Sequence, residues 1–203
     1  MYTSKTVFII VCFIAAAINQ SFAQAGNDTA APVKKKQSVV IYAGGGFASY
    51  LSGIPSPANL KGNITKTHPS GTIRVMWHPG FRLNLGIQSG FTNFYSYDVT
   101  SNNIEGNLRL SAVPILAVWS MPIVKNLEIF AGFGSYLLTS HLDYKEKVVS
   151  STFSLGTNVA VSYTKPLSKN LGLAAEAEWM NAFETKDNSL ALKIQLVWKA
   201  FEF

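Results

Sequence analysis

Cysteine is almost absent from the 203-residue sequence, and the single one, Cys12, lies inside the apolar run Val7–Ala17. Lys5 precedes this run and the polar stretch "INQSFAQA" follows it, which is the three-part pattern of a secretory signal. We therefore predict a signal peptide at residues 1–23, with cleavage after Ala23, which removes the only thiol. The mature chain then has no disulfide, no thiolate nucleophile and no cysteine metal ligand.

Long apolar runs are also missing after the predicted signal peptide. The best candidate, Leu110–Val124, is shorter than the roughly twenty residues that a spanning helix requires. It also contains Pro114 and Pro122. These features exclude a membrane protein built from helices.

Histidine is scarce, and its three positions, His68, His78 and His141, do not have the spacing of metal ligands. The stretch "TSHLD" brings Ser140, His141 and Asp143 close in sequence, which invites comparison with a hydrolase. Adjacent strand residues point to opposite faces, however, so the serine is poorly placed to bond the histidine. We predict no metal, no cofactor and no enzymatic activity.

The balance of charge is basic, with a formal net charge of +6 and a pI near 9.4. The only basic run, Lys34 to Lys36, lies in a stretch at residues 24–36 that lacks periodicity and reads as a flexible periplasmic tail. The other basic residues are scattered, so we predict no nucleic-acid partner. Attraction to anionic lipid head groups or cell-wall polymers is the better interpretation.

From Gln37 to Phe203 the sequence is a series of long alternating segments. The stretch "FRLNLGIQSGFTNFYSY" at residues 81–97 places large apolar residues at alternate positions, the period of a strand with two different faces. It is far longer than the usual strand of roughly five or six residues. Eight such segments are predicted near residues 37–51, 70–77, 81–97, 106–120, 127–141, 150–164, 171–183 and 189–203.

The connections between these segments alternate in character. Residues 78–81, 121–126 and 165–170 are short and rich in turn residues, whereas 52–69, 98–105 and 142–149 are longer or more polar. Short turns at one end and longer loops at the other are typical of an up-and-down membrane barrel. We therefore predict one domain at residues 37–203, an all-β, eight-stranded, antiparallel transmembrane β-barrel.

A soluble eight-stranded barrel is the main alternative, and the composition of the two faces distinguishes them. A soluble barrel fills its outer face with charged residues, but one face here is mostly small, which fits a narrow interior: Gly44, Gly46, Ala48, Gly86, Gly90, Gly132, Gly134, Ser154, Gly156, Ala160, Gly172 and Ala174. The large apolar set then faces lipid: Val39, Ile41, Leu83, Leu85, Ile87, Phe153, Leu155, Val161, Leu190, Leu192, Ile194 and Leu196.

Aromatic residues gather at both ends of the predicted strands, as in the interfacial girdles of membrane barrels. The set near the short turns is Trp77, Phe81, Trp119, Tyr163 and Trp198. The set near the longer loops is Phe91, Tyr95, Tyr97, Trp179 and Phe183.

Together, the signal peptide, the tail, the eight amphipathic strands, the segment "AVPILAVW" at residues 112–119 and the aromatic Phe203 resemble the porin-like outer-membrane β-barrel domain proteins. The resemblance implies insertion into a Gram-negative outer membrane, among its lipids and lipopolysaccharide, by the barrel assembly machinery, which recognises a terminal aromatic such as Phe203. We expect a monomer. The outward set up to Trp198 is even-numbered but Phe203 is odd-numbered, so either the strand ends near Trp198 or a bulge at Lys199–Ala200 resets the register.

On these faces seven charged residues are predicted to point inward: Arg74, Arg82, Arg109, Glu128, Glu176, Glu178 and Lys193. An eight-stranded barrel is only wide enough for its own side chains, and a buried charge is costly unless paired. We predict an ion pair between Glu178 and Lys193 and a second cluster of Arg74, Arg82 and Glu128. Such a network blocks an open channel.

The sequence thus favours a non-enzymatic membrane barrel with a plugged polar interior and a structural or surface-interaction role. Two alternatives stay open: a small diffusion channel for hydrophobic or small solutes, and an outer-membrane lipid-modifying enzyme.

Overall fold

The computed structural model describes residues 36–53, 62–101, 104–144 and 146–203. The predicted signal peptide at residues 1–23 and all but the last residue of the predicted tail at 24–36 lie outside these ranges. Within them, no helix has the length and apolar character needed to cross a membrane.

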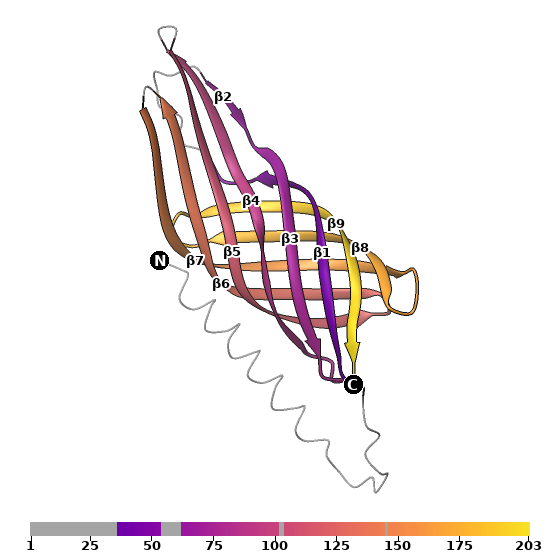
Figure 1. Ribbon diagram of the computed structural model, residues 1–203. Helices are drawn as coiled ribbons and strands as arrows, with labels where there is room; N and C mark the ends of the chain where they lie inside the picture. Colours follow the sequence, from indigo (N-terminus) through magenta and orange to yellow (C-terminus); the bar gives the residue numbers. More distant parts are fainter. Residues whose placement is uncertain (1–35, 54–61, 102–103, 145) are drawn as a thin grey trace, which may run out of the picture. The chain divides into compact units, whose positions relative to one another are not determined.

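The described residues form one sheet closed into a ring (Figure 1). Its strands are β1 (Ser38–Tyr50), β2 (Gly62–Thr65), β3 (Thr67–His78), β4 (Asn84–Ser101), β5 (Ile104–Val124), β6 (Leu127–Tyr144), β7 (Glu146–Pro166), β8 (Leu171–Ala182) and β9 (Asp187–Glu202). Only Lys66 separates β2 from β3, and both pair with β4, so together they make one interrupted wall strand. β1 pairs with β9 and β4 pairs with β5, which closes an antiparallel up-and-down barrel of eight strands, as predicted.

The short turns lie at the end of the barrel where β1 begins and β9 ends, which we call the short-turn end. There the backbones of Gln37 and Phe203 exchange two hydrogen bonds of 2.9 Å. The tightest turn is Lys125–Asn126, where Asn126 takes φ of 70°, a left-handed conformation that asparagine tolerates well. β5 runs as far as Val124, so the predicted turn at 121–126 is mostly strand.

The opposite end differs from the prediction, because two of the expected loops are mainly strand. β4 continues to Ser101 and β5 starts at Ile104, while β6 continues to Tyr144 and β7 starts at Glu146. The expected loops at 98–105 and 142–149 are therefore strand hairpins. Their polar composition misled the prediction, since a hairpin that leaves the membrane can be polar on both faces. In Figure 1, β4 to β7 rise well beyond the ends of β8 and β9.

The two faces of the wall divide by burial as the alternation predicts. Along β8 every second side chain is buried and the residues between them are exposed, because successive side chains of a strand point to opposite faces. On β4 and β9 the exposed side chains include large apolar residues, such as Ile87 at 68%, Leu192 at 64% and Ile194 at 55% exposure. A wall of this kind fits contact with lipid.

The aromatic girdle at the short-turn end has the predicted members, and all five side chains are exposed: Trp77, Phe81, Trp119, Tyr163 and Trp198. At the other end the prediction is wrong for Tyr95 and Tyr97. The pairing of β4 with β5 shifts between Asn93 and Tyr95, so Phe94 is an extra residue that turns the following part of β4 over. Tyr97 is buried, and the Tyr95 ring packs 5.2 Å from that of Tyr50.

The last strand contains the bulge that was one of the two predicted alternatives. Val40 pairs with Lys199, but its neighbour Val39 pairs with Phe201, so Ala200 is the extra residue. The bulge returns Phe201 to the outer face, where its side chain is 66% exposed.

Candidate functional site

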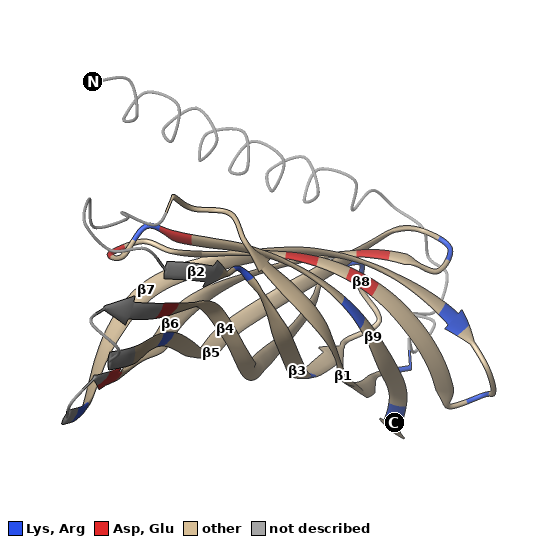
Figure 2. Ribbon diagram, turned by 90° about the horizontal axis from the view of Figure 1, so that it is seen from above, with Lys and Arg blue, Asp and Glu red and all other residues tan. Residues whose placement is uncertain are grey.

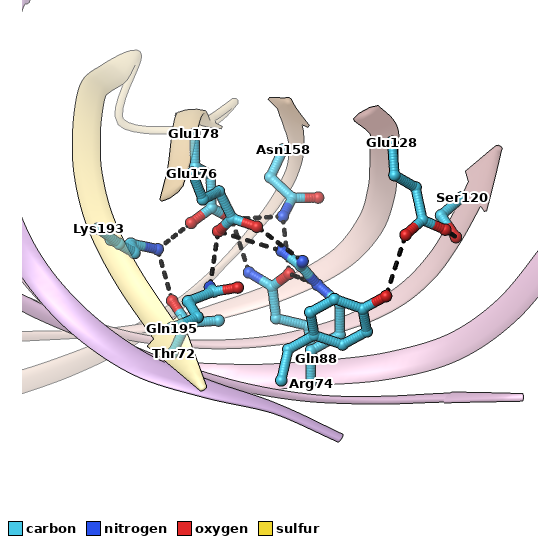
Figure 3. A network of polar contacts seen from close by, with 11 residues as sticks. Thr72, Arg74, Gln88, Ser120, Glu128, Asn158, Glu176, Glu178, Lys193 and Gln195 are labelled. Carbon is cyan, nitrogen blue, oxygen red and sulfur yellow. Dashed lines mark hydrogen bonds and ion pairs between the residues drawn. The ribbon is translucent and has the colours of Figure 1, made fainter. Parts of the chain in front are cut away.

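Two buried ion pairs lie in the middle of the barrel (Figure 3). Strand alternation directs Arg74 of β3, Glu176 and Glu178 of β8, and Lys193 of β9 inward, and each is at most 3% exposed. The Arg74 Nη1 atom lies 2.8 Å from Glu176 Oε2, and Lys193 Nζ donates to Glu178 Oε2. Strands β1 and β9 separate β3 from β8 in the sheet, so the Arg74–Glu176 pair crosses the lumen.

The pairing differs from the simplest reading of the register. Glu176 is the residue directly opposite Lys193 on the neighbouring strand. Lys193 instead reaches diagonally to Glu178, two residues along the same face, because Arg74 occupies Glu176 from across the lumen. The Glu178–Lys193 contact that the sequence suggested is therefore present. Arg74 pairs with Glu176, the acid that lies directly opposite Lys193.

Neutral amides connect the two ion pairs. Gln88 of β4 accepts from Arg74 Nε at 2.8 Å and donates to Glu178 Oε1 at 2.6 Å. Asn158 of β7 donates to the same Glu178 oxygen at 2.5 Å. These bonds matter because a buried carboxylate needs more than one partner to offset the loss of water.

The remaining partners come from β3 and β9. Gln195 donates to Glu176 Oε1 at 2.9 Å, and Lys193 donates to Thr72 Oγ1 at 2.5 Å. Two positive and two negative side chains thus share one hydrogen-bonded network, which balances its charge. We call these eight residues the central network: Thr72, Arg74, Gln88, Asn158, Glu176, Glu178, Lys193 and Gln195.

Apolar side chains cover the central network on the short-turn side. The Arg74 guanidinium carbon lies 4.1 Å from the centroid of the Phe130 ring, a cation–π geometry. Tyr42 meets Phe130 edge to face, with ring centroids 5.5 Å apart. Met76 and Val118 are buried on the same inner face.

Toward the opposite end of the barrel, where β4 to β7 extend beyond the wall, the interior is again mainly apolar. Its fully buried side chains include Phe94, Leu116, Tyr136, Leu138 and Met180. Tyr136 donates to the carbonyl oxygen of Thr157 at 3.1 Å, so its one polar atom is satisfied. The central network therefore lies between two apolar layers.

Glu128 does not join the arginine cluster that the sequence suggested. Its carboxylate, half-buried nearer the short-turn end, accepts from Tyr42 at 3.0 Å, Asn84 at 3.0 Å and Ser120 at 2.5 Å. Arg74 is engaged by Glu176 instead.

The prediction of an inward position is wrong for Arg82 and Arg109, whose side chains are exposed. Arg82 precedes the start of β4 and lies in the connection at residues 79–83. Arg109 lies on β5, where the even-numbered residues such as Leu116 and Val118 face inward.

A cavity of about 350 Å³ opens at the short-turn end of the barrel. Its lining includes Val40, Tyr42, His78, Glu128 and Val197. Tyr42 is also one of the side chains that cover the central network, so the cavity reaches the apolar layer on the short-turn side.

Among the described residues no group of three or more histidine, cysteine or acidic side chains is placed to hold a metal ion. His141 is exposed and pairs with Arg109 of the neighbouring strand, and Asp143 lies 3.7 Å from Lys147.

The long strands leave the edge of β7 open beyond the barrel wall. β7 pairs with β6 from Glu146 onward, but its pairing with β8 starts only at Gly156. Within the described residues, Lys147 to Phe153 therefore have a strand neighbour on one side only. Their side chains are exposed on both faces of the hairpin.

A closed barrel with an apolar outer wall and a filled interior that holds its buried charges in pairs defines a transmembrane β-barrel of the small up-and-down class. No protein-family model matches the sequence, and a search of curated proteins finds no relative. Among solved structures the chain is similar to a major outer membrane protein from Thermus thermophilus, with a TM-score of 0.50 and 14% identity over 82% of this chain and 99% of that one.

Two further solved structures are similar over most of their length. Neisserial surface protein A gives a TM-score of 0.47 and 13% identity over 80% of this chain and 98% of that one. The attachment invasion locus protein Ail of Yersinia pestis gives 0.46 and 12% over 84% and 100%. The Thermus comparison shows that this chain has the fold of an outer-membrane β-barrel.

Proposed function

We infer that the protein is a non-enzymatic barrel of a Gram-negative outer membrane, with a plugged interior and a surface-interaction role carried by β4 to β7. The observation that carries this proposal is the sheet that continues past the barrel wall with an open edge on β7. The short turns and both described ends of the barrel domain then face the periplasm, and the long hairpins face the medium.

The filled interior supports a role other than transport. The central network spans the lumen between two apolar layers, and its charged side chains are almost completely buried. Water or solute can pass only if these pairs separate, which leaves charges unpaired at a cost of several kcal/mol. This favours the proposal over a small diffusion channel.

The open edge of β7 supports a surface interaction. Unpaired N–H and C=O groups along an edge strand are a template on which an extended segment of another protein can pair. Val148 and Val149 are 52% and 60% exposed at this edge, and they would flank the side chains of an added strand. The partner class that fits is therefore an extended polypeptide.

Cysteine labelling of intact cells tests the orientation. Ser151→Cys, on the open edge, should react with a membrane-impermeant maleimide on intact cells, whereas Ser168→Cys, in the turn between β7 and β8, should react only after permeabilisation. Labelling of Ser168→Cys alone on intact cells would overturn the orientation.

Two further measurements test the role itself. Purified wild type in planar bilayers should give no steady single-channel current, and such a current would refute the plug. Cells whose chain lacks residues 141–149, which shortens the β6–β7 hairpin, should attach less to protein-coated surfaces than cells with the full chain. Equal attachment, with equal amounts of barrel in the membrane, would refute the interaction role of this sheet.

A further inference from the structure

A groove of about 680 Å³ crosses the lipid-facing wall over β1, β9, β8 and β7 as far as Leu127 of β6. Its floor is made by Ala175 and Ala177 of β8. Ala175 pairs with Tyr163 on one side and Ile194 on the other. In the next row, Ala177 lies between Val161 and Leu192. The groove is thus a trough of methyl groups between walls of large side chains, and an acyl chain has the shape and chemistry to fill it.

Two lysines lie just beyond one end of this groove. Leu127 and Tyr163, which line that end, pair across β6 and β7. The next backbone contact is the 2.8 Å hydrogen bond from Thr164 N to Asn126 O. Lys125 and Lys165 are each one residue further on, so their flexible side chains can reach the same point past Tyr163. Both are exposed, and within the described residues neither forms an ion pair.

The surroundings of these lysines are those of a membrane interface. Val124, beside Lys125, is 60% exposed, and Tyr163, on the same outer face as Lys165, is 52% exposed. A cation bordered by lipid-facing side chains lies at the depth of head-group phosphates, which is also where tyrosine hydroxyls gather. This placement favours a lipid over a soluble polyanion.

The charge of the whole short-turn end points the same way. In Figure 2 blue segments gather near the C-terminus, while red and blue mix at the opposite end. The exposed basic residues at the short-turn end include Arg82, Lys125, Lys165 and Lys169. Among the described residues, Glu202 is an exposed acid at this end, and it already contacts Lys36 and Lys199. Anionic lipid is therefore attracted to this rim.

We propose that the groove binds an acyl chain of an anionic phospholipid whose phosphate is held by Lys125 and Lys165. The lysines act as point charges on the phosphate. The alanines of the trough leave room for the acyl chain that larger side chains would fill. The site goes beyond the surface-interaction role, because it lies at the other end of the barrel and on its lipid face.

Native mass spectrometry tests the site, with the protein in micelles that contain equal amounts of phosphatidylglycerol and phosphatidylcholine. Wild type should retain phosphatidylglycerol in preference. Lys125→Gln with Lys165→Gln should lower that preference by about tenfold or more, because each of the two lysines contributes to the attraction of the anionic lipid. Arg82→Gln with Lys169→Gln is the matched control, because it removes the same charge from the same rim.

A second variant tests the groove independently of charge. Ala175→Leu faces lipid and fills the trough, so the retention of both lipids should fall while the fold, checked by circular dichroism, is unchanged. Three results would overturn the proposal. The first is an unchanged lipid preference in the Lys125/Lys165 variant. The second is an equal loss in the control, which would mean diffuse attraction to the rim. The third is a dimer that Ala175→Leu abolishes, which would mean that a second copy fills the groove.

Discussion

The short strands β1, β3, β8 and β9 and the long strands β4 to β7 divide the barrel wall into two halves with different contents. The short strands have 13, 12, 12 and 16 residues, and three of them carry every charge of the central network. The long strands have 18, 21, 18 and 21 residues and give that network only the neutral Gln88 and Asn158. Their extra length forms the open-edged sheet.

On the proposed function, this difference assigns stability and surface interaction to separate parts of one sheet. Charges buried in the short half must stay paired, so substitutions there should lower the free energy of unfolding strongly. The hairpins of the long half are exposed on both faces, so substitutions there should change the free energy of unfolding little. The predictions below test that division in order of expected effect.

The largest effect is expected from Glu178→Ala. It leaves the Lys193 ammonium buried without its carboxylate, which should lower the free energy of unfolding by about 3–5 kcal/mol. Thermal unfolding followed by circular dichroism measures this. Lys193→Ala in the same background should restore part of the loss, so the double variant should cost less than the two singles summed. Additive losses would disprove the coupling, and Asp143→Ala, which removes an exposed ion pair of the long half, should change almost nothing.

The next effect separates the membrane-spanning and protruding parts of the long strands. Ile87→Arg places a charge on the lipid face between the two aromatic girdles and should cost about 2–4 kcal/mol. Val149→Arg places the same charge on the β7 edge beyond the wall and should cost close to nothing. Unfolding in urea from lipid vesicles compares them. Equal costs would contradict the proposal that the open edge of β7 lies outside the membrane.

The sequence was sufficient for the barrel because alternation is a local property. Each strand had to be apolar on one face where it crosses the membrane, and residues 85–91 show this without knowledge of any partner. The same reasoning located Glu178 and Lys193, because a hairpin of known parity places both side chains on one face.

The sequence was insufficient where parity changes or where contacts cross the lumen. The extra residue Phe94 reverses β4, and this moved Tyr95 and Tyr97 from the predicted girdle to the interior. The Arg74–Glu176 pair joins strands that are not neighbours, so no pairing rule predicts it. Gln88 and Asn158 have the parity of the inner face, but parity alone does not distinguish an amide that bonds a buried charge from another inward polar residue.

A smaller effect is expected from Gly132→Ala, which probes the network from the long half. A methyl group at this position would overlap the Oδ1 atom of Asn158. Asn158 must then shift away from Glu178, which should cost about 1–3 kcal/mol, the usual range for overpacking. Gly53→Ala is the control, since a methyl group there meets nothing within 4 Å. Equal melting temperatures for the two variants would mean that Asn158 does not support the network.

The smallest effect is expected at the exposed ion pair between Lys36 and Glu202, 2.8 Å apart at the start of the short half. The hydrogen bond and the charge of Glu202 raise the pKa of Lys36 above its ordinary value of 10.5. A raised lysine pKa contributes stability below pH 10.5 that is lost as the pH rises through the higher folded-state value. Lys36→Gln should therefore lower the melting temperature only slightly, by the same amount at pH 7 and pH 9. The difference should vanish above the folded-state pKa and in high salt, because solvent and ions screen an exposed pair. A loss as large as that of Glu178→Ala would mean that exposed charge stabilises the short half as strongly as buried charge, and the proposed division of the barrel would fail.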